Sequence, residues 1–477
     1  MLLPLKNLDF LALARQTAKN VPAYREFLKL KGAKVPNFDK DFLALPETDK
    51  NSYFRAFQLK KLFPKEVLPP FAYASSGSSG KPTFWFRGSE QERIGVESHE
   101  VIFRDIWNIG KSDETLVIIC FSMGLWVAGS YTLASCRGLS QKGYKITAVT
   151  PSIDKADTVY VFKKLCPQFK NVVIAGYPPF VADVLLEVKK RKIDIPKNLY
   201  ILTAGDSFTE KWRDDIGALA NIKKPHHIVS VYGSADTGIL AFETPLTIAL
   251  RRKAQKDRAL ACSLFGEVKE IPPILQYDPR MLFIEESKGG ELLITAPTAS
   301  PLIRYNIHDR GKIIDLNKLQ EKWKLPDVGR KFNGWNKMPV ISTFGRTDVA
   351  VTLYALNIYP EHIISCIKRA PFKNLLSGSF LVYNKTTHGS KRQTLHIRLE
   401  MLPRAEKQAA RFGNASDVFA EYLSQVNIEY KKLKSAIGRK ALPKIHFMQN
   451  GDSLLWKNKG PGLVFTKGKK SRITNND

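Results

Sequence analysis

Cysteine is scarce in this sequence of 477 residues, and the few cysteines lie far apart. They form no Cys-x-x-Cys pair, and no histidine cluster stands beside them. Zinc sites built from cysteine use such close spacings, so we expect no zinc site. Scattered buried thiols in a reducing compartment fit the pattern better. These residues are Cys120, Cys136, Cys166, Cys262 and Cys366.

A secretion signal and a membrane span are not expected either. The first ten residues have neither a basic leader nor a long apolar stretch before a cleavage site, which predicts a cytoplasmic protein. Residues 115–136 contain no charged residue, and that length could cross a bilayer. Serines and glycines divide this stretch into two apolar blocks. We therefore expect a buried strand at 116–120, a glycine-containing turn and a helix.

Acidic residues are few relative to basic ones. The 74 Lys and Arg residues against 45 Asp and Glu residues give a net charge of +29, and the segment from Arg346 to the end is enriched, with 23 basic against 9 acidic residues. Such a charge attracts polyanions, which include nucleic acid, anionic membranes, nucleotide cofactors and acidic carrier proteins. A basic charge that serves only to keep the protein soluble would give the same excess of Lys and Arg. Because no recognised nucleic-acid-binding motif is present, a nucleic-acid-binding protein is only the second hypothesis.

Apolar residues make up 44% of the chain, enough for more than one packed domain. Strand-like and helix-like runs alternate between residues 116 and 232, which predicts an α/β fold with a parallel sheet covered by helices. The first seventy residues are expected to be helical, and 284–296 and 301–314 to form a strand pair. The expected strands are 116–120, 145–149, 171–175 and 198–203, and the expected helices are 181–192, 360–368 and 415–433.

The pattern changes after Arg346 to shorter strands, two helices and a tail rich in lysine and glycine. We expect a large N-terminal domain of residues 1–345 with helix-covered β-sheets. A small, mobile α+β domain of residues 346–477 follows, with the boundary near Asp348.

A serine- and glycine-rich loop stands between two apolar runs near residue 80. Small residues let the backbone approach a phosphate closely, and amide and hydroxyl hydrogens donate to its oxygens. The loop is no Walker A motif, because Pro82 stands where a magnesium-binding Ser or Thr would follow the lysine. A flexible linker is the alternative. The predicted phosphate-binding residues are Ser75, Ser76, Gly77, Ser78, Ser79, Gly80 and Lys81.

The loop resembles the phosphate loop of the adenylate-forming superfamily, which includes acyl-CoA synthetases, peptide-synthetase adenylation domains and firefly luciferase. Other signatures of that superfamily follow in order. Residues 232–238 resemble its Tyr-Gly-x-Thr-Glu block, in which the aromatic lies near adenine and the acid helps to hold Mg²⁺. Here Asp236 replaces the glutamate and Ala235 the threonine. The shorter carboxylate still suits a hard cation.

Three further segments resemble the nucleotide-binding motifs of this superfamily. Residues 204–209 resemble the segment that contacts adenine, and 304–309 resemble Tyr-Arg-Thr-Gly-Asp, whose acid accepts hydrogen bonds from the ribose. Residues 344–348 resemble the hinge motif, with Asp348 at the pivot. The resemblance implies an adenine and ribose site formed by Ala204, Gly205, Asp206, Tyr232, Gly233, Ser234, Asp309 and Arg346.

Within the superfamily, the chain is most similar to the phenylacetate–CoA ligase family. Residues 20–25 resemble its Asn-Val-Pro-x-Tyr-Arg signature, 121–129 its glycine-rich acyl-pocket stretch, and 468–472 its terminal segment. An aromatic or medium apolar acid would suit such a pocket, although core packing would use the same residue types. The Cys/His metal cluster of many members has no counterpart in 239–273. The implied acyl pocket consists of Phe121, Met123, Gly124 and Trp126.

The resemblance implies that ATP and Mg²⁺ convert a small carboxylic acid into an acyl-adenylate, with Asp236 and Lys469 as catalytic residues. Rotation about Asp348 would then allow transfer to a thiol, with CoA as the co-substrate. Ala355 stands where glycine usually lets a pantetheine chain pass. An acidic acyl carrier protein or an amine is therefore the alternative acceptor. A degenerate, non-catalytic relative is a third hypothesis.

Overall fold

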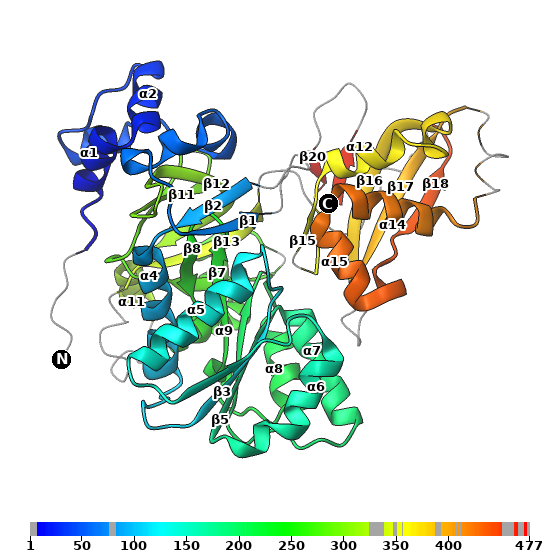
Figure 1. Ribbon diagram of the computed structural model, residues 1–477, viewed down its shortest axis with the longest axis horizontal. Coiled ribbons are helices and arrows are strands. Elements are labelled where there is room, and N and C mark those ends of the chain that lie inside the picture. Colours follow the sequence, from blue (N-terminus) through cyan, green and yellow to red (C-terminus); the bar gives the residue numbers. More distant parts are fainter. Residues whose placement is uncertain are drawn as a thin grey trace. The chain divides into compact units, whose positions relative to one another are not determined.

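The computed structural model describes residues 7–75, 83–205, 207–268, 270–323, 338–346, 351–354, 356–386, 393–403, 405, 409, 412–450, 462–465 and 472–474 (Figure 1). Contacts divide the chain into two compact units. The first consists of residues 1–74 and 84–347, and the second of residues 75–83 and 348–477.

Short helices separated by turns make up most of the described part of the first seventy residues, residues 7–70, as predicted. Asp9 caps the first helix by accepting a hydrogen bond from the amide of Ala12 at 2.8 Å, and Pro22 opens the second, where its missing amide hydrogen is not needed. Tyr24, Phe27 and Tyr53 form their aromatic core. The three helices are α1 (Phe10–Asn20), α2 (Pro22–Leu30) and α3 (Asp39–Leu43).

An eleven-stranded sheet forms the centre of the first unit, in the order β10-β11-β12-β13-β9-β8-β7-β6-β5-β3-β4. The strands are β3 (Thr115–Cys120), β4 (Ile146–Val149), β5 (Asn171–Gly176), β6 (Leu199–Ala204), β7 (Ile228–Ser234), β8 (Gly238–Phe242), β9 (Ile274–Gln276), β10 (Phe283–Glu286), β11 (Glu291–Ala296), β12 (Leu302–Ile314) and β13 (Val340–Arg346). Strands β3 to β7 pair in parallel, as the alternating pattern predicts. The remaining pairs are antiparallel.

Helices cover both faces of the parallel strands, which explains why every residue of β3 and β5 is buried. Helix α5 contacts β3 and β4 and packs on α4, whereas α6 contacts β3 and α7 contacts β5 (Figure 1). The α/β class is therefore confirmed. The helices are α4 (Ser89–Val101), α5 (Val127–Gln141), α6 (Lys155–Lys164), α7 (Pro178–Lys190), α8 (Glu210–Leu219), α9 (Pro245–Lys256), α10 (Arg258–Phe265) and α11 (Leu316–Lys322).

Two sequence-based predictions of continuous elements are wrong. Residues 284–296 form the hairpin β10–β11, because the chain turns at Gly290, which has a positive φ of 74°. Residues 415–433 form two helices, because Asn427 has extended backbone and caps the second one by accepting a hydrogen bond from the amide of Tyr430.

The charge-free stretch 115–136 consists of β3, a turn and the start of α5, as expected. Among the helices of the described residues, none combines the length and the apolar character that a bilayer crossing needs.

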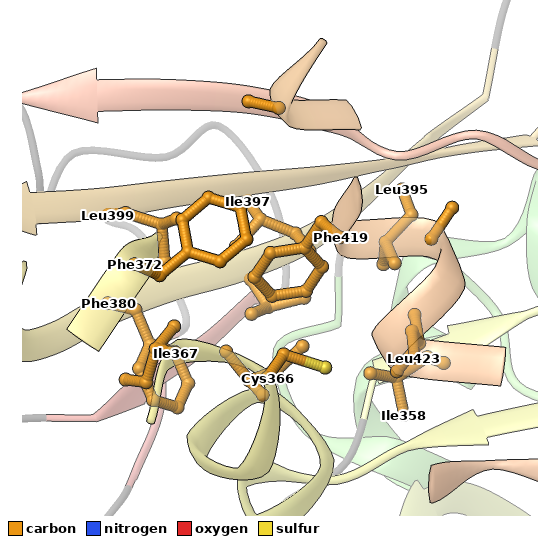
Figure 2. Packing of buried hydrophobic residues seen from close by; sticks show 14 of the residues in the cluster. Ile358, Cys366, Ile367, Phe372, Phe380, Leu395, Ile397, Leu399, Phe419 and Leu423 are labelled. Carbon is orange, nitrogen blue, oxygen red and sulfur yellow. The ribbon is translucent and has the colours of Figure 1, made fainter. Parts of the chain in front are cut away.

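The second unit is an α+β structure with its own core. Its five-stranded sheet has the order β18-β17-β16-β19-β20, and the β14–β15 hairpin forms a separate two-stranded sheet that packs against the same core. Phe372, Phe380, Ile397 and Phe419 meet in the buried cluster between sheet and helices (Figure 2). The elements are β14 (Val351–Leu353), β15 (Leu356–Ile358), α12 (Pro360–Ile367), β16 (Leu376–Thr386), β17 (Gln393–Met401), α14 (Ala415–Val426), α15 (Ile428–Ile437), β18 (Lys444–Met448), β19 (Gly462–Phe465) and β20 (Arg472–Thr474).

Candidate active site

The tight turn between β7 and β8 holds Asp236. Strand β7 pairs with β8 so closely that a Cβ atom on Gly233 would clash with the carbonyl oxygen of Gly238. Glycine is therefore required at position 233. The hydroxyls of Ser234 and Thr237 lie 2.8 Å apart and close the turn. This geometry fixes the position of the carboxylate between them.

The carboxylate of Asp236 is buried, with 7% of the residue exposed, and yet it is held in its ionised form. Burial by itself would raise its pKa. The positive charge of Lys50 and hydrogen bonds from Ser234 and Tyr305 outweigh burial, so the pKa lies below the usual aspartate value. The hydroxyl of Tyr305 donates to Oδ2 at 2.5 Å. A buried carboxylate that stays charged is suited to a cationic ligand.

Hydrogen bonds between distant segments place Lys50 and Tyr305 beside Asp236. Thr48 pairs with β12: its amide donates to the carbonyl of Arg304 at 3.2 Å, and its carbonyl accepts from the amide of Asn306 at 2.8 Å. Lys50, two residues later, lies 5.5 Å from the ring centroid of Trp85 in the strand β2 (Thr83–Arg87). The lysine is thus held between β12 and the strand that follows the predicted phosphate loop.

Tyr232, Asp309 and the backbone of Arg346 come together at the next strands. The hydroxyl of Tyr232 donates to Oδ2 of Asp309 at 2.6 Å. In the antiparallel pair β12–β13, Asp309 lies directly opposite Arg346. Three residues that the sequence assigns to adenine and ribose therefore meet in one place, although they come from three strands.

Other predicted residues follow the carboxyl ends of the parallel strands. Ala204 ends β6 and pairs with Val231 of β7, and Gly205 follows with a positive φ of 87°. Open α/β sheets bind ligands at this edge, where neighbouring connections leave in opposite directions. The chain leaves β3 toward β4 on one side and leaves the adjacent β5 toward β6 on the other side. The segment after β3 therefore lies at such a point.

The predicted acyl-pocket stretch lies at that point. Phe121 follows β3 and is buried, Gly124 has a positive φ of 84°, and Trp126 caps α5. The stretch folds back on itself, because a Cβ atom on Gly129 would lie 2.6 Å from the sulfur of Met123. Leu125 accepts a hydrogen bond from the amide of Ala74 at 2.7 Å, in the strand β1 (Phe71–Ser75) that leads into the predicted phosphate loop.

Several predicted site residues cannot be placed. Ser75 and Arg346 lie in strands, but their side chains are not described. The predicted residues that lie outside the described ranges altogether are Ser76, Gly77, Ser78, Ser79, Gly80, Lys81, Asp206, Asp348, Ala355 and Lys469.

Sequence reasoning assigned no role to Lys50 or Tyr305. Tyr305 lies inside the segment 304–309, which resembles the ribose motif, so its place in that motif could have identified it as a site residue. Lys50 offers no such signal, because it lies in the N-terminal helical segment and belongs to none of the motifs. Within the described residues, no group of three or more His, Cys, Asp or Glu side chains could hold a metal ion.

No model of a protein family matches the sequence, and no curated protein matches it. Solved structures match along most of the chain. The structure of 2-hydroxyisobutyryl-CoA ligase with 2-HIB-AMP and CoA, in the thioesterification state, has a TM-score of 0.64 and 15% identity over 93% of this chain and 86% of that one.

The same ligase in the postadenylation state, with 2-HIB-AMP, gives a TM-score of 0.51 at 15% identity, again over 93% of this chain and 86% of that one. At this identity the likeness establishes the fold. The chain therefore has the same overall α/β fold as this CoA ligase.

Proposed function

We propose that this protein activates a carboxylic acid with ATP and then transfers the acyl group to a thiol. The acid's carboxylate oxygen attacks the α-phosphorus of ATP, and the bond from that phosphorus to the bridging oxygen breaks. Pyrophosphate leaves and an acyl-adenylate remains. A thiolate then attacks the acyl carbon and AMP leaves. The observation that supports this proposal most is the buried Asp236 in the turn after β7, whose carboxylate accepts a hydrogen bond from Tyr305 and whose pKa is lowered.

Asp236 fits a magnesium site that is completed by the nucleotide. Mg²⁺ is usually bound through one or two carboxylates together with substrate phosphates and water. The single carboxylate of Asp236, ionised despite its burial, meets that need, and the Ser234 hydroxyl supports it. When bound, the ion supplies positive charge where negative charge accumulates on the transferring phosphoryl group.

The ribose and adenine would bind beside this carboxylate. Tyr232 and Asp309 are already joined by a hydrogen bond, so the acid is held in a fixed orientation beside Tyr232. We assign the ribose hydroxyls to Asp309 and the adenine to the segment formed by Tyr232, Ala204 and Gly205. Preorganised groups of this kind reduce the cost of orienting ATP for attack.

Lys469 is proposed as the cation that bridges the substrate carboxylate and the α-phosphate. The tail also holds Lys467 and Lys470, which serve as matched controls. We expect Lys469→Ala to abolish adenylation while Lys467→Ala and Lys470→Ala retain it. Adenylation that is unchanged in Lys469→Ala would show that another residue supplies this charge.

The thiol acceptor is proposed to be CoA, since a solved structure of the same fold is a CoA ligase in complex with CoA. An acyl carrier protein or an amine is the alternative. Incubation of the acyl-adenylate with CoA, with a carrier protein or with simple amines separates the three, because each product has a different mass.

Asp236→Asn tests the proposal. It keeps the size of the side chain and removes the charge, so ATP–pyrophosphate exchange with a panel of carboxylic acids should fall by a factor on the order of 100 or more. Asp278→Asn is the control: Asp278 is similarly buried, at 6% exposure, and pairs with Arg280. It should lower stability and leave exchange intact. Equal exchange in wild type and Asp236→Asn would contradict the proposed role.

A further inference from the structure

Arg87, the last residue of β2, is a buried cation without an ion-pair partner among the described residues. Only 1% of the residue is exposed. Its Nη2 donates to the carbonyl of Ala235 at 3.1 Å, while Nε and Nη1 have no hydrogen-bond partner in the described part of the chain. Buried arginines are rare unless they are paired, because an unpaired charge is costly to remove from water. The two remaining donors therefore require an explanation.

Arg213 shows how this chain neutralises an arginine that has a structural role. It is equally buried, at 1% exposure. Its guanidinium pairs with Glu210 at 2.9 Å and with Glu243 at 2.6 Å. Among the described residues no carboxylate forms an ion pair with Arg87, although Glu92 is near enough for the two charges to interact.

Two tyrosines enclose the guanidinium of Arg87 instead. Its central carbon lies 4.4 Å from the ring centroid of Tyr131 and 5.5 Å from that of Tyr73. These faces stabilise the cation and leave the N–H edge for another ligand. Glu92 is the nearby acid, and it is hydrogen-bonded to Tyr73. Burial raises its pKa, although the charge of Arg87 opposes that effect.

The surroundings of Arg87 come from three segments of the candidate site. Tyr73 belongs to β1, which leads into the predicted phosphate loop. Tyr131 belongs to α5, directly after the predicted acyl-pocket stretch, and Ala235 precedes Asp236. Nη1 lies 3.1 Å from the position that a Cβ atom on Gly238 would occupy. Nη1 is itself buried, and a side chain at position 238 would press against it and against the hydroxyl of Tyr131.

We propose that Arg87 binds a second anionic group of the acid substrate, most simply a second carboxylate. This inference rests on the proposed function and narrows its substrate class to dicarboxylic acids with an apolar or aromatic body. The reacting carboxylate loses its charge when the acyl-adenylate forms, so an arginine bound to it would stabilise the free acid against the reaction. A second carboxylate keeps its charge through both half-reactions and matches the fork of the guanidinium.

The test compares acids that differ only in the second carboxylate: hexanoate with adipate, and phenylacetate with 2-carboxyphenylacetate. Wild type should use the dicarboxylate of at least one pair with a kcat/KM on the order of 100-fold higher. Arg87→Gln should abolish this preference and leave the monocarboxylate rate within a few-fold. Arg87→Lys should keep part of it. The control is Arg104→Gln. Arg104 is exposed and pairs with Asp105, and its replacement should leave the preference for the dicarboxylate unchanged.

A wild-type enzyme that prefers the monocarboxylate in both pairs would overturn the inference, and so would equal losses for both acids in Arg87→Gln. The wild-type comparison stands even if that variant fails to fold. A thermal-shift measurement separates the two proposals. If no acid releases AMP but dicarboxylates still raise the Tm of wild type and not of folded Arg87→Gln, then Arg87 binds the anion and the proposed reaction is wrong. No AMP release together with no shift overturns both.

Discussion

At the scale of single residues, the charge state of Asp236 depends on groups that are distant in the sequence. Burial raises the carboxylate pKa, and Lys50 is the largest of the effects that lower it. The folded pKa is below the unfolded one, so the ionised form stabilises the fold above the unfolded pKa. That stabilisation is lost as the pH falls through the folded pKa.

Lys50→Gln should therefore move this loss of stability to higher pH, because burial then acts with less opposition. Urea denaturation between pH 3 and pH 7 measures it. Lys61→Gln is the control, since Lys61 is exposed and pairs with Glu26 at 3.6 Å. In an Asp236→Asn background the shift should disappear. A shift that persists there would show that Lys50 acts on another group.

The residue scale also shows where prediction from sequence stops. Asp236 and Asp309 were found because each lies inside a short segment with a recognisable order of residue types. Tyr305 donates to Asp236 from 69 residues away, and Arg87 donates to Ala235 across 148 residues. No local pattern encodes such contacts, because they depend on how strands are paired.

At the scale of elements, a buried ion network connects α8 and α9 to β7. Arg213 of α8 pairs with Glu210 and Glu243, and Arg251 of α9 lies 3.5 Å from Glu210. Glu243 in turn accepts a hydrogen bond from the amide of Ser230 in β7 at 2.9 Å. The network therefore supports the strand that leads to Asp236.

Replacing Arg213 by Leu should lower the free energy of unfolding by about 3–5 kcal/mol, because Glu210 and Glu243 lose their closest buried cation. Urea denaturation of the two proteins measures the difference. Lys211→Ala is the control in the same helix: Lys211 is exposed, pairs with Asp215 at 3.3 Å, and should change stability by less than about 0.5 kcal/mol. If both variants lost a similar free energy of unfolding, the burial of the Arg213 ion pairs would not contribute to stability.

Element types were predictable where periodicity was strong, and boundaries were less so. Four of the five parallel strands, β3 to β6, lie where their apolar runs predict them. The hairpin at Gly290 and the break at Asn427 were missed, because one glycine or one asparagine inside an apolar pattern does not by itself reveal a turn. Backbone conformation at a single residue decided both.

At the scale of the whole molecule, the net charge of +29 should favour encounters with anionic substrates. Salt screens such attraction, since the Debye length falls from about 10 Å at 0.1 M to about 3 Å at 1 M ionic strength. If CoA is the acceptor, its KM should rise with added KCl. Pantetheine has the same thiol without the phosphates and should respond much less. Equal responses of the two thiols would mean that the positive charge does not serve CoA binding.

The sequence by itself determined the α/β class, the order of the motifs and the positions of the predicted catalytic acids, because periodicity and short segments are local properties. Only the tertiary structure decided what surrounds those acids. Strand pairing brought Thr48 to β12, and with it Lys50 and Tyr305 to Asp236. It also buried Arg87 between two tyrosines without an ion-paired carboxylate among the described residues. Charges and hydrogen bonds act over a few ångströms in space, so their effect is set by packing and not by distance along the chain.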